Sequence, residues 1–187
     1  TIKYNRNGTI SRWKSRFVVC GYSQRQGIDY ERAFSATLRG TTFRTLLAVA
    51  AGKKLRLMQI DVSNAFTQAK MDHVDLFVEP AKGFERWECC KRETGPCICG
   101  KFQSFLLHLK RALYGTKQAS RLWQSALRSF LVDECSIKFK PSPTDPCLYR
   151  AELNGEEIIV GVYVDDLIVA YKGDNLYSSF VKQFMAR

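Results

Sequence analysis

Two adjacent aspartates, Asp165 and Asp166, interrupt an apolar stretch near the end of the sequence, VYVDDLIVA at 162–170. An aspartate pair at a tight turn commonly caps nearby backbone groups. The apolar runs on both sides predict two covered strands, however, so the turn between them is expected to face a cleft. Adjacent carboxylates repel each other there unless a cation neutralises them. The pair is therefore a candidate cation site as well as a candidate turn.

A third carboxylate, Asp61, stands near the end of another predicted strand, within LRLMQIDVSNAF at 55–66. If the two strands pair in one sheet, Asp61 and Asp165 can hold two divalent ions roughly 3.5 to 4 Å apart, the separation used in two-metal phosphoryl transfer. Oxygen ligands without His or Cys beside them favour Mg²⁺ over Zn²⁺, with Mn²⁺ as a substitute. Two such ions activate an attacking 3'-hydroxyl and stabilise a leaving pyrophosphate. The expected chemistry is nucleotidyl transfer.

Tight turns are expected at both ends of the sequence. An Asn-Gly turn within residues 5–9 predicts an N-terminal β-hairpin, which would present Arg12, Lys14 and Arg16 on one strand face. Near the other end, an Asn-Gly turn at 154–155 joins a strand to the apolar run that reaches the two aspartates. The aspartates are therefore expected at the tip of a strand, tight turn, strand unit.

Apolar spacing predicts three helices. The first is a short buried helix over 41–52 that ends at Gly52, and the second is an amphipathic helix over 116–135. The third is expected to use Asp174 as its N-cap. With a further strand in VDLFVEP, the elements follow in the order hairpin, helix, strand, strand, helix, hairpin, helix. This order favours an α+β fold, an antiparallel sheet with helices packed on one face.

The composition is that of one globular domain with a basic surface. The chain has 187 residues, 45% of them hydrophobic, and no run approaches the roughly 20 apolar residues of a membrane span. Lys and Arg number 29 against 18 Asp and Glu, a net charge of +11 concentrated before residue 60 and within 101–140. This excess predicts a polyanionic partner such as a nucleic acid. A basic surface that only aids solubility explains the charge equally well.

The seven cysteines indicate reduced thiols in an intracellular protein, because their number is odd and the chain can fold without disulfides. Four of them, Cys89, Cys90, Cys97 and Cys99, crowd into one segment. Their spacing does not give the C-x2-C turns of the usual zinc site, so a loop is favoured over a metal centre.

Three motifs, in this order along the chain, carry a resemblance to a known family. QIDVSNAF at 59–66, ALYGTKQASRLW at 112–123 and YVDD at 163–166 resemble the palm motifs of copia-type retrotransposon reverse transcriptases. The similarity extends over nearly the whole chain, through RWKSRFVVCGYSQRQGIDYERAFS, TTFRTLLAVAA, VDLFVEPAKGFE and DPCLY. YVDD alone is a weak signal, whereas three motifs in order within a similar background are specific.

The resemblance implies an RNA-directed DNA polymerase with a right-hand fold. Residues 1–52 and 70–115 would form the fingers, residues 53–69 and 116–187 the palm, and the thumb would be absent. Its substrates would be deoxynucleoside triphosphates and a primer on an RNA or DNA template. The parent Pol polyprotein would supply integrase, RNase H and thumb segments. By the same resemblance, the protein would be intracellular, located in the cytoplasmic virus-like particle and the nucleus, and would not bind a membrane. The chain alone is expected to synthesise DNA weakly or not at all.

The same resemblance assigns roles to single residues. Asp61 and Asp165 would bind the metal ions, with Asp166 as the neighbouring catalytic carboxylate. Phe66, five residues after Asp61, would stack under the incoming sugar and exclude a 2'-hydroxyl, although a core aromatic is the alternative. Further nucleotide-binding residues would be Val62, Lys14, Arg16, Tyr114, Gly115 and Lys117. Contacts to template or primer would come from Arg12, Lys117, Gln118, Arg121 and Tyr163.

Two other functions are weighed against this one. A catalytically inactive, nucleic-acid-binding remnant would keep the fold and the basic surface, but it has no need of three converging carboxylates. Another two-metal enzyme, such as a nuclease, would use the carboxylates but has no need of a sugar gate at Phe66. The aspartate set and Phe66 together therefore favour the polymerase.

Overall fold

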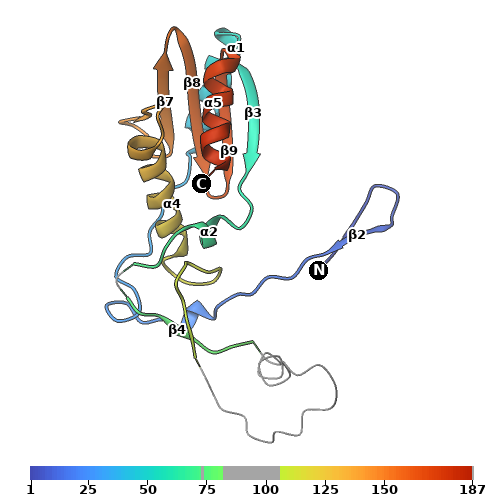
Figure 1. Ribbon diagram of the computed structural model, residues 1–187, viewed down its shortest axis with the longest axis vertical. Helices are drawn as coiled ribbons and strands as arrows, with labels where there is room; N and C mark the ends of the chain where they lie inside the picture. Colours follow the sequence, from blue (N-terminus) through green and yellow to red (C-terminus); the bar gives the residue numbers. More distant parts are fainter. Residues whose placement is uncertain (73, 82–105, 187) are drawn as a thin grey trace, which may run out of the picture.

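The computed structural model describes residues 1–72, 74–81 and 106–186. Its centre is a five-stranded antiparallel sheet with the strand order β3-β9-β8-β7-β6 (Figure 1). The strands are β1 (Ile2–Tyr4), β2 (Ile10–Trp13), β3 (Arg56–Asp61), β4 (Phe77–Val78), β5 (Leu107–His108), β6 (Lys140–Pro141), β7 (Leu148–Leu153), β8 (Glu156–Tyr163) and β9 (Asp166–Lys172). The helices are α1 (Gly40–Gly52), α2 (Ala65–Gln68), α4 (Ala119–Ser129) and α5 (Asp174–Met185), with a 3₁₀ turn η1 (Gly21–Ser23) and a π turn η2 (Phe130–Glu134). The cluster of four cysteines lies outside the described residues.

The two predicted turns that build the sheet are confirmed. Asn154 and Gly155 have φ of 52° and 78°, the left-handed backbone that a two-residue hairpin turn between β7 and β8 requires. β8 and β9 then pair from Tyr163 and Asp166 outward, so Val164 and Asp165 form the next turn. The aspartates therefore lie at a hairpin tip, as the sequence predicts.

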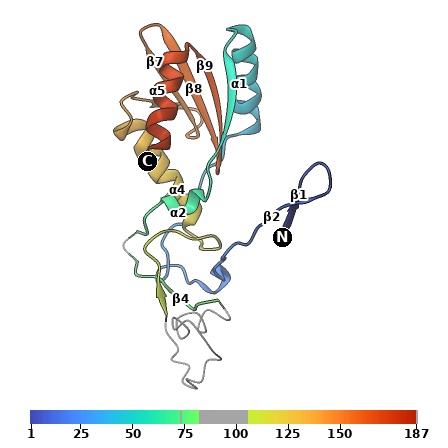
Figure 2. The ribbon, with the colours of Figure 1, turned by 45° about the vertical axis from the view of Figure 1, so that its right-hand side comes forward.

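Helices cover both faces of the sheet, so the expectation of helices on one face is wrong (Figure 2). Val160 and Leu167 pack with α4 and α5 on one face, whereas Ile159 and Ala170 pack with α1 on the other. Successive strand residues point to opposite faces. The consecutive apolar residues of β8 therefore need cover on both sides, and β8 is buried along most of its length.

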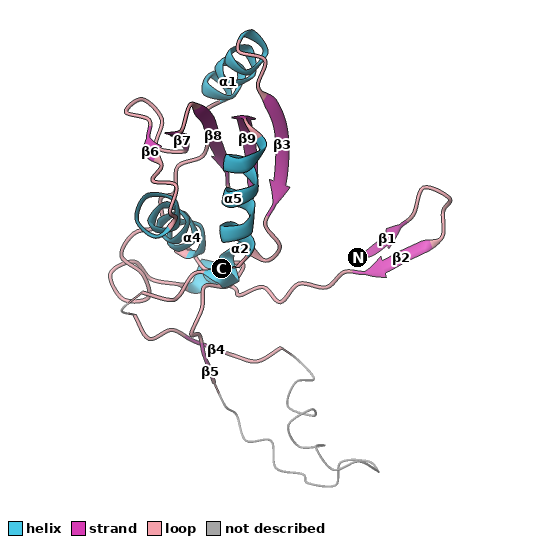
Figure 3. Cartoon of the chain, turned by 45° about the horizontal axis from the view of Figure 1, so that its top comes forward, coloured by secondary structure: helices cyan, strands magenta, loops and turns pink. Residues whose placement is uncertain are grey.

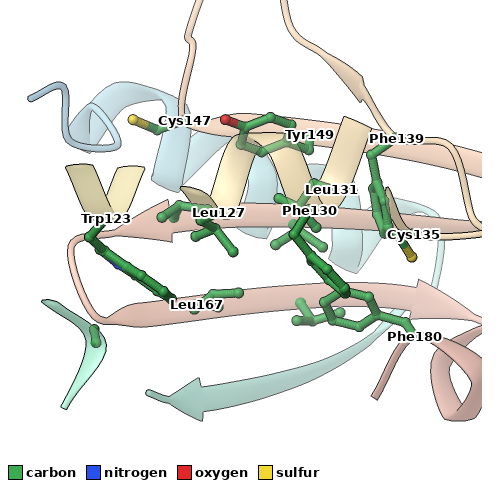
Figure 4. Close-up of a cluster of buried hydrophobic side chains, with 14 of the residues drawn as sticks. Trp123, Leu127, Phe130, Leu131, Cys135, Phe139, Cys147, Tyr149, Leu167 and Phe180 are labelled. Carbon is green, nitrogen blue, oxygen red and sulfur yellow. The ribbon is translucent and has the colours of Figure 1, made fainter. Parts of the chain in front are cut away.

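The main core lies between the sheet, α4, η2 and α5 (Figure 4). Leu127, Leu131 and Phe180 are almost fully buried, and the Phe180 ring meets the Phe139 ring edge-on with 5.5 Å between their centroids. Trp123 enters the same core one turn of α4 before Leu127. This apolar contact fixes α4 against the strands that carry the aspartates.

The first helix is less buried than predicted. In α1 only Leu46 and Ala50 are buried, and Phe43 is 39% exposed. The helix ends at Gly52 as expected, but its C-cap is Lys53, and Lys54 then takes the left-handed backbone at φ 54°. The helix is amphipathic and contacts the sheet along one narrow stripe.

The last helix begins differently from the prediction. Gly173, at φ 98°, is the N-cap of α5, and Asp174 is the first helical residue. The carboxylate of Glu156 accepts a hydrogen bond from the Leu176 N–H at 2.8 Å, so a residue of β8 caps the helix. Asp174 instead forms an ion pair with Arg56 at 2.7 Å.

The N-terminal hairpin is confirmed, but its basic face is shorter than expected. β2 ends at Trp13, so Lys14 and Arg16 lie beyond the strand that carries Arg12. The hairpin projects away from the sheet on an extended segment (Figure 3). In the central sheet, β3 is an edge strand with mostly exposed residues, and Ile60 near its end packs against the main core.

Two of the three cysteines in the described part of the chain, Cys135 and Cys147, are buried, and Cys20 is exposed; all three are free thiols. Burial raises the pKa of both buried thiols, so they remain protonated and unreactive. None of the helices in the described ranges combines the length and apolar character needed to span a membrane.

A buried carboxylate fixes the segment that leads into α1. Asp145 is 1% exposed, and it accepts hydrogen bonds from the backbone N–H groups of Arg39 at 3.1 Å and Cys147 at 3.0 Å. Burial alone would raise the pKa of Asp145, but these donors and the Thr42 side chain hold it below the ordinary value. The ionised form is therefore the one that the fold stabilises.

We predict that Asp145→Asn lowers the free energy of unfolding by about 1.5–3 kcal/mol at pH 7, because it weakens charge-assisted hydrogen bonds. A carboxyl group with a lowered folded pKa stabilises the fold above its unfolded pKa of about 3.9, and this contribution is lost as the pH falls through the folded pKa. The difference between wild type and variant should therefore shrink below that pH. Urea unfolding between pH 7 and 3 measures it, with the exposed Asp133→Asn as the control. If the difference in the free energy of unfolding between wild type and Asp145→Asn did not change with pH, the ionised Asp145 carboxylate would not be the stabilising form.

Candidate active site

The pairing of β3 with β9 brings Asp61 to the aspartate turn. The register places Asp61 directly opposite Asp166, and the Val62 N–H donates a hydrogen bond to the Asp165 carbonyl oxygen at 2.9 Å. Figure 1 shows the two strands side by side with their ends at the same edge of the sheet. Two segments that are distant in the sequence therefore meet where the sequence predicts that they should.

The turn that carries Asp165 is strained. Val164 has φ 57°, a left-handed backbone that β-branched residues rarely adopt. The indole N–H of Trp123 donates a hydrogen bond to the Val164 carbonyl oxygen at 2.7 Å. Because Trp123 is itself buried in the core, α4 holds this turn in its conformation.

The two facing carboxylates lie on the α1 side of the sheet. Asp166 accepts a hydrogen bond from the side-chain amide of Gln59 at 3.0 Å, and Asp61 is exposed to solvent. A cavity of 530 Å³ adjoins Asp166 and is lined by Gln59, Tyr163 and Phe43 among others. A ligand can therefore approach Asp166 from this face.

The three aspartates share an edge without converging on one point. Among the described residues, no three His, Cys, Asp or Glu side chains are grouped closely enough to hold a metal ion together. Asp61 and Asp166 face each other as cross-strand partners, whereas Asp165 belongs to the turn. The shared edge is an observation, and metal binding by these residues stays a prediction.

A second group of predicted residues is assembled around Tyr114. The rings of Phe66 and Tyr114 lie 4.8 Å apart at an angle of 49°, and the guanidinium carbon of Arg16 lies 5.6 Å from the centre of the Tyr114 ring. Phe66 is half-buried on α2, which begins after Asn64 in a left-handed backbone at φ 54°. Two residues expected to bind the nucleotide, Phe66 and Arg16, thus both contact a third, Tyr114.

Gly115 permits a close approach between two backbone segments of the chain itself. Its φ is +91°, and a Cβ at this position would lie 2.1 Å from the carbonyl oxygen of Val19. A Cβ on Gly21 would lie 1.9 Å from the Gly115 carbonyl oxygen. The Val19 N–H donates to the Tyr114 carbonyl oxygen at 2.8 Å. The segment around Arg16 is therefore docked directly beside Tyr114.

Two of the residues predicted to contact nucleic acid are used inside the protein. Gln118 is fully buried and hydrogen-bonds to the Gln24 side chain at 3.1 Å and to the Asp29 carbonyl oxygen at 3.3 Å. Arg121 forms an ion pair with Asp72 and donates to the Arg32 carbonyl oxygen at 2.8 Å. Both side chains hold distant segments together, so neither is free to reach a template as it stands.

The other predicted contacts lie at or near the surface. Tyr163 is 56% exposed, and Arg12 and Lys117 are exposed as well. The Lys117 backbone N–H donates a hydrogen bond to the Gln24 side chain at 2.7 Å. Gln59 was not among the predicted site residues, and its position two residues before Asp61 is the sequence signal that could have identified it.

Sequence comparison relates the chain to known proteins. Residues 1–187 match the family model described as "Reverse transcriptase (RNA-dependent DNA polymerase)". The retrovirus-related Pol polyprotein from transposon RE1 of Arabidopsis thaliana is 34% identical over 169 residues, which cover 90% of this chain and 10% of that protein. The Pol polyprotein from transposon TNT 1-94 of Nicotiana tabacum is 32% identical over 168 residues, which cover 89% and 11%. No solved structure gives a significant match.

The chain therefore belongs to the reverse transcriptase family. Within it, the similar transposon proteins are copia-type Pol polyproteins, as the motifs predict. The Ty1-NL2 Gag-Pol polyprotein of Saccharomyces cerevisiae is more distant, at 25% identity over 162 residues that cover 87% of this chain and 8% of that protein. The chain spans about a tenth of the length of the plant relatives that it matches.

We predict that Trp123→Phe loosens the aspartate turn. The substitution removes the indole donor to Val164 and should lower the free energy of unfolding by about 1 kcal/mol. Hydrogen exchange should become faster at the Val62 amide, which is bonded to the same turn, and should stay unchanged at the distant turn at 154–155. Equal acceleration at both ends of the hairpin would show general destabilisation instead.

We predict that Gly115→Ala destabilises the docking of residues 18–21. The new methyl group would overlap the Val19 carbonyl oxygen and strain a left-handed backbone, at a cost of about 2 kcal/mol or more in the free energy of unfolding. Gly52→Ala is the matched control, because a Cβ at Gly52 would meet no atom within 4 Å. Denaturant unfolding of both variants is the measurement, and equal midpoints would contradict the close approach.

Proposed function

We propose that this chain is the polymerising part of a copia-type retrotransposon reverse transcriptase. A primer 3'-hydroxyl attacks the α-phosphate of a deoxynucleoside triphosphate, the 3' oxygen forms the new bond to phosphorus, and pyrophosphate leaves. The observation that carries the proposal is the register of β3 with β9, which sets Asp61 opposite Asp166 at the turn of Asp165. Family membership over the whole chain supports the same reaction.

The donor set fits divalent cations of the Mg²⁺ class. All three side chains offer carboxylate oxygens, the ligands that hard cations prefer, and reverse transcriptases generally use divalent metal ions. Asp61 and Asp165 would hold the ions, with Asp166 as the adjacent carboxylate. Bound there, two ions would activate the primer hydroxyl and stabilise charge on the leaving pyrophosphate.

The nucleotide would enter between the aspartate edge and the aromatic group. Phe66 would lie under its sugar and leave no room for a 2'-hydroxyl, with Val62 between Phe66 and Asp61 along the chain. Arg16 and Lys14 would bind the triphosphate. The contact of Arg16 with the Tyr114 ring supports this arrangement, because the same ring also contacts Phe66.

Template and primer would be bound through charge and stacking, without sequence readout. The exposed Arg12, Lys117 and Tyr163 are suited to this task. In this proposal residues 1–52 and 70–115 form the fingers, and residues 53–69 and 116–187 form the palm. The matched part is about a tenth of the plant Pol polyproteins, so thumb, RNase H and integrase segments are proposed as partners in the parent polyprotein.

A second candidate is an inactive remnant that binds nucleic acid. It is favoured by one observation, namely that no three carboxylates are grouped for metal binding among the described residues. Such a protein would bind primer and template with the salt dependence of a basic surface but would not extend the primer. Primer extension therefore separates the active polymerase from the inactive remnant.

Asp165→Asn should reduce incorporation of deoxynucleotides on a homopolymer template by roughly 100-fold or more, since loss of a metal ligand removes several kcal/mol of transition-state stabilisation. The measurement uses an extended protein in which further Pol segments follow the chain. Asp133→Asn is the matched control, because Asp133 is an exposed aspartate on η2 and takes no part in the pairing of β3 with β9. Equal incorporation by wild type and Asp165→Asn would remove Asp165 from the mechanism, and no incorporation by wild type would favour the remnant.

A further inference from the structure

Gln59 contacts the aspartate edge from the edge strand. It stands two residues before Asp61 on β3, so both side chains lie on the same face of the sheet. Its direct cross-strand partner is Ile168, two residues after Asp166. Gln59 and Asp166 are therefore diagonal neighbours on the same face, within reach of a long side chain. The hydrogen bond from Nε2 to Oδ1 measures 3.0 Å.

We propose that Gln59 is a positioning residue for Asp166. Its amide holds one carboxylate oxygen, which fixes the rotation of the Asp166 side chain and leaves the other oxygen available beside Asp61. This role deepens the proposed function and rests on it. In the reaction, Gln59 touches neither primer nor nucleotide and acts only through Asp166.

The chemistry of an amide suits this position. A Lys or Arg side chain would neutralise Asp166 and compete with a cation for it, and a Glu would add a further negative charge to the three aspartates. An amide donates a hydrogen bond without carrying a net charge. The carboxylate is therefore oriented while the negative charge that attracts a cation is kept.

The fold itself has little need of Gln59. The residue is exposed on an edge strand, so replacing it removes little buried surface. Leu57 occupies the same face of the same strand, is 42% exposed, and pairs with Ala170 rather than with a residue near the turn. A change at Leu57 therefore reproduces the structural effect of a change at Gln59 without touching Asp166.

The test compares Gln59→Leu, which keeps the size but removes the donor, with Leu57→Ala. Binding of Mn²⁺ to the 187-residue chain is followed by the paramagnetic resonance of free Mn²⁺, and thermal unfolding is recorded without metal. Gln59→Leu should weaken Mn²⁺ binding on the order of 10-fold, as loss of an outer partner of a ligating carboxylate does. Leu57→Ala should bind as wild type does, and both variants should unfold at the wild-type temperature.

The extended polymerase supplies a second measurement. Gln59→Leu should raise the Mg²⁺ concentration for half-maximal primer extension by a similar factor, and saturating Mg²⁺ should restore the rate. Unchanged Mn²⁺ binding, an equal change in Leu57→Ala, or a loss of rate that Mg²⁺ does not restore would each overturn the role of Gln59. If wild type binds Mn²⁺ but extends no primer, the proposed function fails, and the Mn²⁺ comparison still decides whether Gln59 positions Asp166.

Discussion

The antiparallel register between β3 and β9 is the constraint on which the candidate site depends. Side chains alternate between the two faces of a sheet, so a slip of one residue would move Asp61 away from the face that carries Asp166. The register is held at one end by the Val62 N–H on the Asp165 carbonyl oxygen and at the other by Arg56, which pairs with Asp174 and lies 5.2 Å over the Tyr171 ring. An edge strand with little buried surface is thus kept in place by contacts at its two ends.

Strain at the hairpin tip is balanced by the core. The left-handed backbone of Val164 costs about 1–3 kcal/mol, and the fold maintains it because Trp123 donates to its carbonyl oxygen. Trp123 belongs to the motif ALYGTKQASRLW, which the sequence links to the candidate site. Its position on α4 explains the link physically, since Leu122 and Leu127 bury the same helix in the main core. A core helix therefore determines the conformation of the turn that carries Asp165.

Local patterns predicted much of the fold, and long-range contacts account for what they missed. The hairpin at Asn154 and Gly155 and the helical spacing of α4 are local signals, and both are confirmed. The internal role of Gln118 depends on Gln24, 94 residues earlier, and no short pattern indicates that pairing. The cap of α5 likewise comes from Glu156 on β8 rather than from a residue beside the helix.

The candidate site was likewise predicted from local motifs only in part, because long-range contacts complete it. Motif order indicated that Asp61 and the aspartate pair belong together, and the register agrees, but the motifs did not indicate how each carboxylate is held. That information lies in Gln59 and Trp123, whose hydrogen bonds cross from other elements. The expected single-sided sheet failed for a related reason. Consecutive apolar residues on β8 show that two faces are covered, but they do not tell which helix covers each.

The spacing between Asp61 and Phe66 also has a physical basis. β3 ends at Asp61, and the left-handed backbone of Asn64 reverses the chain so that α2 can begin at Ala65, which is fully buried. At the other end of α2, the Ala112 N–H donates to the Ala69 carbonyl oxygen at 3.0 Å, and this bond brings Tyr114 beside Phe66. One short turn and one backbone hydrogen bond therefore fix the distance between the aspartate edge and the aromatic group, which is why a motif of eight residues can specify two parts of one site.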